Sequence, residues 1–370
     1  MAIKILFFHF DLGNGGAEKV LVNLANNLDP EKYDITVKTL FNYGENKDTL
    51  NSNIHREWVL DKKPFRGVTK MLRLFSPRLL HRLFVKDSYD VEVAFLEGTP
   101  ARIVSGCPNC STRKYAWIHV EIGEKKQFFG SFRNMNEASI CYHKFNGIAC
   151  VSEYTMKRFV DVTGWNDLPI SVVHNVLEVD KIIRESHAAI PLSLNPSELN
   201  ICSVGRLNTQ KGYDRLLRVL GALNNEGIAD WHLYLMGQGE EKKNLETIAA
   251  ECSICEKVTF LGYVQPPYPY VSKMDLFVCS SRREGFSTAV SEAIIVGTPV
   301  ITTLCSGMEE ILGKDGGVIV ENSEQGLFEG LKQLLTDRSL IIKNREKAIK
   351  RSSIFSTRSA IKEFENFIHE

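Results

Sequence analysis

Short apolar runs alternate with amphipathic helical patterns along the whole chain. In Ala17–Leu28, for example, Val20, Leu21 and Leu24 recur on one helical face. This alternation of buried strands and helices is typical of parallel sheets with crossover helices. The predicted strands are Ile3–Phe10, Asp34–Leu40, Val91–Leu96, Lys114–His119, Gly147–Val151, Ile170–Val173, Asn200–Val204, Trp231–Met236, Lys257–Leu261, Asp275–Cys279, Pro299–Thr303 and Gly317–Val320.

The chain has 370 residues, which is too long for a single hydrophobic core. A polar stretch with two prolines, Val176–Leu199, separates the two sets of strands and is the predicted linker. We therefore expect an α/β protein with two Rossmann-like, doubly wound domains, residues 1–175 and 198–354. A C-terminal helix at about 355–370 is expected to pack back on the first domain. Ligands of such folds bind outside the carboxyl ends of the strands, so the cleft between the domains is the predicted site.

Composition narrows the class of protein further. Lys plus Arg equals Asp plus Glu at 45 each, which gives no support for a nucleic-acid partner. Cysteines such as Cys150, Cys202 and Cys279 lie inside apolar runs, which is typical of buried thiols in a reducing cytoplasm. The apolar start of the chain reads as a strand rather than a signal peptide. No apolar run reaches the ~18–20 residues that span a bilayer. We expect a cytoplasmic protein, soluble or peripheral to the membrane.

Three motifs follow predicted strands. The first, Gly13–Glu18 (GNGGAE), precedes a helix. Gly15 and Gly16 let the backbone approach a ligand closely, and the helix N-terminus offers free N–H groups to an anion. The motif lacks the third glycine of the dinucleotide fingerprint. A plain tight turn explains it equally well.

The second motif, Gly205–Gly212 (GRLNTQKG), follows the first strand of the second domain. Arg206 and Lys211 are five residues apart on a strand-to-helix loop and can converge on one oxygen-rich anion. Arginine supplies a planar fork of donors, and lysine a compact charge. Two solvated basic residues on a loop are the alternative interpretation.

The third motif, Glu284–Glu292 (EGFSTAVSE), follows a strand and opens a helix. Glu284 lies in the loop, where its carboxylate can accept hydrogen bonds from sugar hydroxyls. Glu292, about two turns into the helix, can reach a ribose diol. The amides of Phe286–Thr288 are directed at an anion bound at the helix end. The alternative is an acidic surface loop with an unrelated helical glutamate.

Together, these motifs resemble family-four retaining glycosyltransferases of the GT-B fold, of the type that builds bacterial surface polysaccharides. The resemblance covers most of the chain, is strongest over Asn200–Val320 and is thinnest over Asn42–Tyr89. It implies two Rossmann-like domains that face each other across a donor-binding cleft. It also implies a nucleoside diphosphate sugar as the substrate, with UDP as the expected nucleotide.

The resemblance also implies roles for particular residues. Arg206 and Lys211 would bind the donor diphosphate, Glu284 the donor sugar and Glu292 the ribose. His119, at the end of the strand Tyr115–His119, would touch the donor sugar. The implied catalytic residues are His119, Glu284, Arg206 and Lys211. The implied donor-binding residues are Gly15, Gly16, Arg206, Lys211, Gly262, Tyr263, Val264, Glu284, Gly285, Phe286, Ser287, Thr288 and Glu292, with Asn175 near the interdomain crossing.

The chain departs from the family pattern in two places. Ser287, Thr288 and Ala289 stand where the family often has Gly-Leu-Pro, and Val176 stands where a glycine is usual. No Asp-x-Asp motif occurs, so we expect no metal and no other cofactor. The expected chemistry is metal-independent transfer with retention, in which the leaving phosphate oxygen takes the acceptor proton.

Two further features lie outside these motifs. The pairs Cys107–Cys110 and Cys252–Cys255 both have Cys-x-x-Cys spacing, but they fall in different predicted domains, and we predict no shared metal site.

The segment Lys62–Lys86 is basic and amphipathic, with no acidic residue. It suits an anionic membrane surface, and an ordinary helix pair with a solvated basic face is the alternative.

The leading functional hypothesis is a hexosyltransferase at the inner face of the cell membrane. It would move a sugar from a nucleoside diphosphate donor to a glycan or polyprenyl-linked acceptor in surface polysaccharide synthesis. A GT-B-shaped sugar-nucleotide epimerase or phosphorylase is one alternative. A non-catalytic GT-B partner subunit is the other. The donor sugar, the acceptor, the linkage and the oligomeric state do not follow from the sequence.

Overall fold

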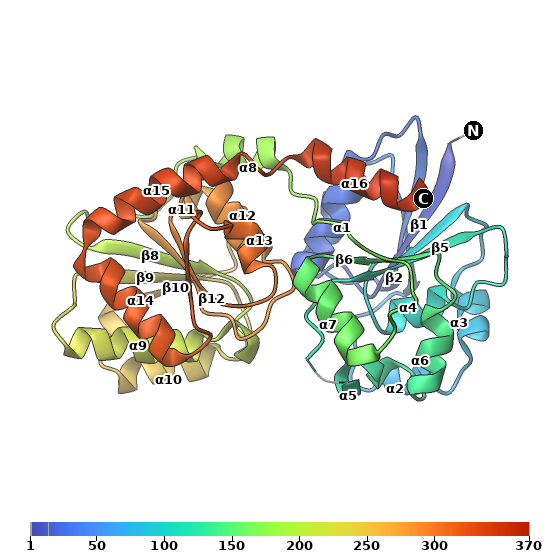
Figure 1. Ribbon diagram of the computed structural model, residues 1–370, viewed down its shortest axis with the longest axis horizontal. Coiled ribbons are helices and arrows are strands. Elements are labelled where there is room, and N and C mark those ends of the chain that lie inside the picture. The colour runs from blue at the N-terminus through green and yellow to red at the C-terminus, as the bar shows by residue number, and fades with distance from the viewer. Residues whose placement is uncertain (1, 14, 124, 370) are drawn as a thin grey trace. The chain divides into compact units, whose positions relative to one another are not determined.

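The computed structural model describes residues 2–13, 15–123 and 125–369, and the chain divides into two units (Figure 1). The first consists of Met1–Leu177 and Thr357–Glu370, and the second of Glu178–Ser356. The predicted limits at 175 and 354 lie close to these boundaries. The predicted linker is different, because its residues from Glu178 onward belong to the second unit and include helix α8 (Val179–Ser186). Only Ile182 and Ser186 of α8 are buried, so the helix has too few apolar positions to be recognised in the sequence.

In its described residues, the first unit holds a parallel sheet of seven strands in the order β3-β2-β1-β4-β5-β6-β7. Helices α1 and α16 cover one face, and α3, α4, α6 and α7 cover the other (Figure 1). The strands are β1 Ile3–His9, β2 Tyr33–Phe41, β3 His55–Leu60, β4 Val91–Ala94, β5 Arg113–Ile118, β6 Gly147–Cys150 and β7 Ile170–Val172. The helices are α1 Gly16–Asn27, α2 Val68–Leu72, α3 Pro77–Phe84, α4 Thr99–Val104, α5 Lys125–Phe128, α6 Met135–Tyr142, α7 Glu153–Thr163 and α16 Thr357–His369.

The described part of the second unit holds a parallel sheet of six strands in the order β10-β9-β8-β11-β12-β13. Helices α9, α10 and α14 cover one face, and α11, α12, α13 and α15 the other (Figure 1). The strands are β8 Leu199–Val204, β9 Trp231–Met236, β10 Val258–Gly262, β11 Leu276–Cys279, β12 Val300–Thr303 and β13 Val318–Val320. The remaining helices are α9 Tyr213–Asn225, α10 Lys242–Glu251, α11 Tyr268–Val271, α12 Thr288–Ile295, α13 Met308–Leu312, α14 Glu324–Thr336 and α15 Arg338–Ser352.

Every predicted strand has an observed counterpart, and the two-sheet α/β architecture is confirmed. The structure adds β3, an edge strand that pairs in parallel with β2. Its sequence, HREWVL, mixes charged and apolar residues, and none of its side chains is fully buried. An edge strand of this kind lacks the continuous apolar run that marks the buried strands of a parallel sheet.

Helix α16 is part of the first unit, although all of the second unit precedes it in sequence. Its Phe364 lies 5.7 Å from Phe7 and stacks on Trp117, with ring centroids 5.9 Å apart. The hydroxyl of Tyr115 donates to the carbonyl of Ile368 at 2.9 Å. Phe364 and Ile368 are fully buried, so α16 supplies part of the core beneath β1 and β5. Within the described ranges, no helix combines the length and the apolar character needed to cross a bilayer.

Candidate active site

The loop after β8 carries the second motif and is shaped by close backbone contacts. A side chain at Gly237 or Gly239 would meet the carbonyl of Gly205 or Leu207, so only glycine fits at either position. The side chain of Asn208 accepts a hydrogen bond from the backbone N–H of Lys211 at 3.2 Å. Gly212 follows in a left-handed conformation with φ of 65° and opens helix α9. These contacts fix Lys211 at the carboxyl end of the sheet.

Lys211 and Glu284, which the sequence places in separate motifs, form an ion pair. Nζ of Lys211 donates to Oε1 of Glu284 at 2.7 Å, and the hydroxyl of Ser281 donates to the same oxygen at 2.5 Å. Glu284 is 8% exposed, so solvent screens the pair only weakly. Burial opposes the charged form of Lys211, but the carboxylate of Glu284, with smaller contributions from Cys279 and Tyr213, raises the pKa of Lys211 above its usual range. Lys211 is therefore a permanent cation at this edge of the sheet.

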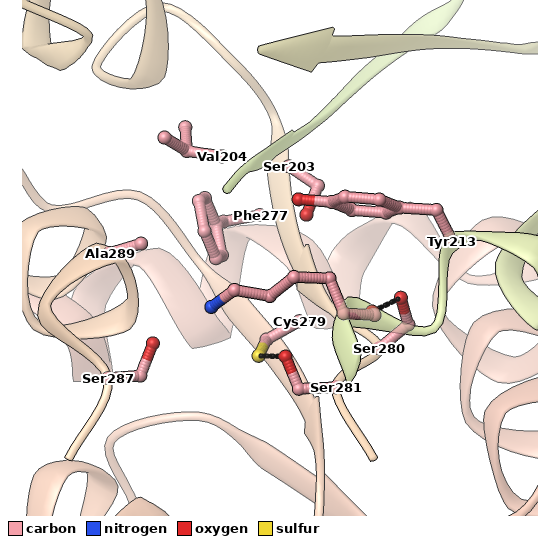
Figure 2. A pocket seen from close by; sticks show the side chains of 10 residues that line it. Ser203, Val204, Tyr213, Phe277, Cys279, Ser280, Ser281, Ser287 and Ala289 are labelled. Carbon is pink, nitrogen blue, oxygen red and sulfur yellow. Dashed lines mark hydrogen bonds between the residues drawn. The ribbon is translucent and has the colours of Figure 1, made fainter. Parts of the chain in front are cut away.

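Lys211 also lies in the wall of a small polar pocket between β8, β11 and α12 (Figure 2). In Figure 2 the hydroxyl of Tyr213 is turned toward Ser203. Burial raises the pKa of Tyr213 to about 12, so its hydroxyl stays protonated at neutral pH. The pocket is lined by Ser203, Val204, Lys211, Tyr213, Phe277, Cys279, Ser280, Ser281, Ser287 and Ala289.

Arg215 is a functional residue that sequence reasoning missed. Its guanidinium is buried and donates from Nε and Nη2 to the carbonyl of Ser280 at 2.9 and 2.6 Å. Nη2 also donates to the carbonyl of Ser281 at 2.7 Å. Arg215 thus holds the loop that carries Ser281 and leads to Glu284. The sequence could have indicated this burial, because Arg215 lies on the same helical face as the apolar residues Leu216 and Val219 of α9, and an arginine that faces solvent is not expected on that face.

Helix α12 begins at Thr288, next to the ion pair. Ser287 is its N-cap, and its hydroxyl accepts from the N–H of Val290. Gly285 and Phe286 lie in the loop before the cap, packed beside Gly307. Glu292 is buried on α12 but is only the fifth residue of the helix. The prediction that it lies about two turns in is therefore wrong, because the helix starts at the cap and not at Glu284.

The other predicted residues of the second unit lie at the same edge of the sheet. Arg206 is exposed, and within the described residues its guanidinium has no hydrogen-bond or ion-pair partner. The structure thus pairs Lys211 with a carboxylate and leaves Arg206 open to solvent. Gly262 is the last residue of β10, and Tyr263 and Val264 follow it. The carbonyl of Gly262 accepts from the N–H of Gly237 at 2.7 Å, which connects the end of β10 to the loop after β9.

In the first unit, His119 follows β5, as predicted, and lies close to two residues that the sequence did not single out. Its backbone N–H donates to Oε2 of Glu97 at 3.1 Å, and its ring lies 4.7 Å from that of Phe95. His9, at the end of β1, contributes its Nδ1 to a 2.6 Å hydrogen bond with the carbonyl of Asp11. Nε2 of His9 and Nε2 of His119 are both buried without a hydrogen-bond partner among the described residues.

The environment of this group perturbs two pKa values. Burial, with a smaller effect of nearby His9, lowers the pKa of His119 to about 3, so His119 is neutral at physiological pH. Burial also raises the pKa of Glu97 to about 6, against the hydrogen bond from the backbone of His119. The carboxyl ends of β1, β4 and β5 thus bring together His9, Glu97 and His119, and the pKa values of Glu97 and His119 are shifted.

The glycine motif caps α1. Gly15 is the N-cap, and the helix starts at Gly16, with Glu18 in its first turn. A Cβ on Gly15 would lie 2.2 Å from Oε2 of Glu18, so a larger residue there would require the flexible side chain of Glu18 to move. Asn14 of the same motif lies outside the described residues. Asn175, expected near the interdomain crossing, is buried in the first unit two residues before its boundary.

Comparison with known proteins shows what the sequence and the fold of this chain are similar to. Residues 189–353 match the family model described as Glycosyl transferases group 1. N-acetylgalactosamine-N,N'-diacetylbacillosaminyl-diphospho-undecaprenol 4-alpha-N-acetylgalactosaminyltransferase of Campylobacter jejuni is 27% identical over 369 residues, or 95% of each chain. The lipopolysaccharide core biosynthesis glycosyltransferase LpsE of Rhizobium meliloti is 25% identical over 341 residues, which cover 91% of this chain and 90% of LpsE. The structure of Anabaena Alr3699/HepE in complex with UDP and glucose covers 100% of both chains with a TM-score of 0.76 and 17% identity, which shows a shared fold.

Proposed function

Since the chain carries a glycosyl transferases group 1 domain and has the GT-B fold, we propose that it is a retaining hexosyltransferase with a UDP-sugar donor. The observation that carries the proposal is the ion pair between Lys211 and Glu284 beside the N-terminus of α12. An ammonium has three N–H donors, and Glu284 accepts one of them, so Lys211 keeps donors for a phosphate oxygen. The exposed Arg206 supplies a second cation on the same loop.

In the proposed reaction, the bond between the anomeric carbon and the β-phosphate oxygen breaks, and a bond to the acceptor oxygen forms on the same face. The acceptor proton passes to the leaving phosphate oxygen. Lys211 and Arg206 stabilise the negative charge that develops on the diphosphate, so the step requires no metal ion. Glu284 holds hydroxyls of the donor sugar, Glu292 holds the ribose, and neutral His119 hydrogen-bonds the donor sugar. Addition of EDTA is therefore expected to leave the rate unchanged.

The acceptor is proposed to bind to the first unit, as a polyprenyl-linked sugar or a growing surface glycan. The names of the two relatives, which mention diphospho-undecaprenol and lipopolysaccharide core, support an acceptor of this class. Such an acceptor is anchored in a membrane, so the enzyme would work as a peripheral protein at the inner face of the cell membrane.

The surface of α2 and α3 supports this membrane contact. We define the α2–α3 surface as the exposed side chains of residues 62–86. Its apolar members include Leu74, which is 75% exposed, and Leu83, which is 53% exposed. Exposed apolar side chains together with exposed cations suit the headgroup layer of an anionic membrane. The exposed basic residues are Lys62, Lys63, Arg66, Lys70, Arg78, Arg82 and Lys86.

Two arginines hold the turn that presents Leu74. Arg102 is buried and donates to the carbonyls of Leu72 and Phe75 at 3.0 and 2.6 Å. Arg133 donates to the carbonyl of Leu74 at 2.9 Å. Glu137 accepts from Arg102 at 2.9 and 3.1 Å, so the buried charge of Arg102 is compensated. The turn is thus fixed with its apolar side chains directed outward, and membrane contact would require no ordering of the loop.

A thermal-shift screen against UDP, GDP, UDP-sugars and GDP-sugars tests the donor. A nucleotide at a hundred times its Kd is expected to stabilise the protein by about 2.7 kcal/mol. Lys211→Met and Arg206→Ala are expected to lose this shift, whereas Lys242→Met, an exposed lysine of the same unit, retains it. If no nucleotide stabilises the wild type, the non-catalytic alternative is favoured. If a UDP-sugar is isomerised in the absence of an acceptor, the protein is an epimerase.

Liposome flotation tests the membrane contact. The double variant Leu74→Ser/Phe75→Ser is expected to lose most binding to vesicles that contain anionic lipid. Ile342→Ser/Ile349→Ser, which removes two exposed apolar side chains of the second unit, is the matched control. Equal flotation of both variants and the wild type would contradict the contact. Stereochemistry is read separately, from the anomeric configuration of the product by NMR.

A further inference from the structure

Three side chains with metal-binding chemistry converge in the first unit, away from the residues assigned to transfer. His81 comes from α3, Glu92 from the central strand β4, and Cys107 from the loop after α4. One ligand atom from each lies within 4.8 Å of the other two. Nε2 of His81 lies 2.9 and 3.1 Å from the two carboxylate oxygens of Glu92. Elements far apart in sequence thus bring a nitrogen, an oxygen and a sulfur to one point.

The position of Glu92 is unusual for a structural carboxylate. It is 1% exposed on β4, where Leu6 of β1 and Lys114 of β5 lie opposite it in the sheet. Its partner His81 is 5% exposed. Burying a carboxylate is costly, and a buried ion pair is often no more stable than apolar residues of similar volume. The pair is therefore weakly explained by stability alone, and a bound cation would give the carboxylate a stronger partner.

The donor set fits one metal in particular. Imidazole nitrogen, carboxylate oxygen and thiolate sulfur are the ligands that Zn²⁺ takes in proteins, in tetrahedral geometry. Bond lengths of about 2.0–2.3 Å place tetrahedral ligands about 3.3–3.8 Å apart. Nε2 of His81 and the carboxylate of Glu92 would therefore separate by a few tenths of an ångström, and a pair near the 4.8 Å limit would approach by about 1 Å. The carboxylate of Glu92 and the thiolate of Cys107 together balance the charge of a divalent ion, and a thiolate of the exposed Cys110 would add one negative charge.

We propose that His81, Glu92 and Cys107 bind a Zn²⁺ ion. Cys110 lies three residues after Cys107 and is exposed. That spacing is one at which two cysteines commonly share a zinc ion, so Cys110 is the protein side chain suited to the fourth position. The ion is structural, since it binds the inner face of α3 to β4 and lies in a different unit from Lys211 and Glu284. It would fasten the helix whose outer face forms part of the α2–α3 surface.

Metal titration of the full-length protein tests the site. Protein dialysed against a chelator is expected to bind one equivalent of Co²⁺, with thiolate-to-metal charge transfer in the near ultraviolet and the intense visible bands of a tetrahedral ion. Zn²⁺ added afterwards should abolish both signals. Cys107→Ser is expected to lose the charge-transfer band or reduce it by at least half, and to weaken binding at least tenfold. Glu92→Gln is expected to weaken binding at least tenfold.

Cys255→Ser removes an exposed cysteine of the other Cys-x-x-Cys pair and is the matched control, expected to bind Co²⁺ as the wild type does. Absence of thiolate charge transfer in the wild type, or unchanged affinity in Cys107→Ser, would overturn the site. Should Cys107→Ser fail to fold, alkylation of the wild type still decides the question. One equivalent of Zn²⁺ should slow modification of Cys107 at least tenfold while Cys255 reacts as before, and equal rates at Cys107 would contradict the proposal.

Discussion

Replacement of Arg215 by methionine is expected to destabilise the second unit and weaken donor binding together. The buried guanidinium makes three hydrogen bonds of 2.6–2.9 Å to the carbonyls of Ser280 and Ser281. Without it, the carbonyl of Ser281 keeps the hydroxyl of Thr303 at 2.6 Å. No described donor replaces Arg215 at the carbonyl of Ser280, and an unsatisfied buried carbonyl costs about 1–3 kcal/mol. Charged hydrogen bonds are worth about 1.5–3 kcal/mol each.

Part of this loss is recovered, because methionine also avoids the cost of burying a cation. The expected net destabilisation is therefore about 2–4 kcal/mol. It is measured as the change in hydrogen exchange of the amides of β11, whose slowest members report opening of the second unit. The nucleotide Kd is expected to rise at least tenfold, since the loop that carries Ser281 and leads to Glu284 loses its anchor.

The comparison variants make the test specific. Arg215→Lys retains a buried cation that can donate to one carbonyl, so it should recover part of both losses. Arg218→Met removes an arginine of the same helix that is 49% exposed and should change stability by less than about 1 kcal/mol. A loss below about 1 kcal/mol in Arg215→Met would refute the assignment, because three strong buried hydrogen bonds cannot be worth so little.

Two further predictions concern stability, and a third concerns donor binding. The pKa of Glu97 is about 6 in the folded state against an ordinary 4.5. The protonated carboxyl group therefore contributes fully to the free energy of unfolding below pH 4.5, and this contribution is lost as the pH rises through 6. Glu97→Gln should remove about 2 kcal/mol of this dependence, seen as a urea midpoint that varies less between pH 4 and pH 7 than that of the wild type. Phe364→Ala should cost about 3–5 kcal/mol in urea unfolding of the first unit, since it empties the space against Trp117. Gly212→Ala places a Cβ 2.2 Å from the carbonyl of Ser280 at a φ of 65°, so donor binding in a thermal-shift assay should be lost. An unchanged midpoint, an unchanged unfolding curve or an unchanged thermal shift would contradict the respective prediction.

The sequence predicted the two sheets because most of the strands are buried on both faces and read as continuous apolar runs. The strands β1, β8 and β11 were recognised for this reason, and the motifs after them fell at the carboxyl ends where ligands bind. Strand β3 and helix α8 were missed, because each buries few apolar side chains. An element that buries few side chains shows little hydrophobic periodicity in its sequence.

The residues of the site were predicted better than their interactions. Lys211 and Glu284 were both singled out, but 73 positions separate them, and only the folded sheet shows that they share a salt bridge. Arg215 and Glu97 were not singled out, since a lone charged residue in a helix or loop usually faces solvent. Their roles depend on burial and on backbone carbonyls or amides, which no local sequence pattern encodes.

The place of α16 in the chain has a consequence for biosynthesis. A ribosome makes all of residues 178–356 before it makes the helix that completes the core of the first unit. Until Phe364 emerges, the surfaces of Phe7 and Trp117 that it covers stay open to solvent. The first unit is thus begun first and completed last during synthesis. A stalled or truncated chain would expose this aromatic surface and be a preferred target for quality control.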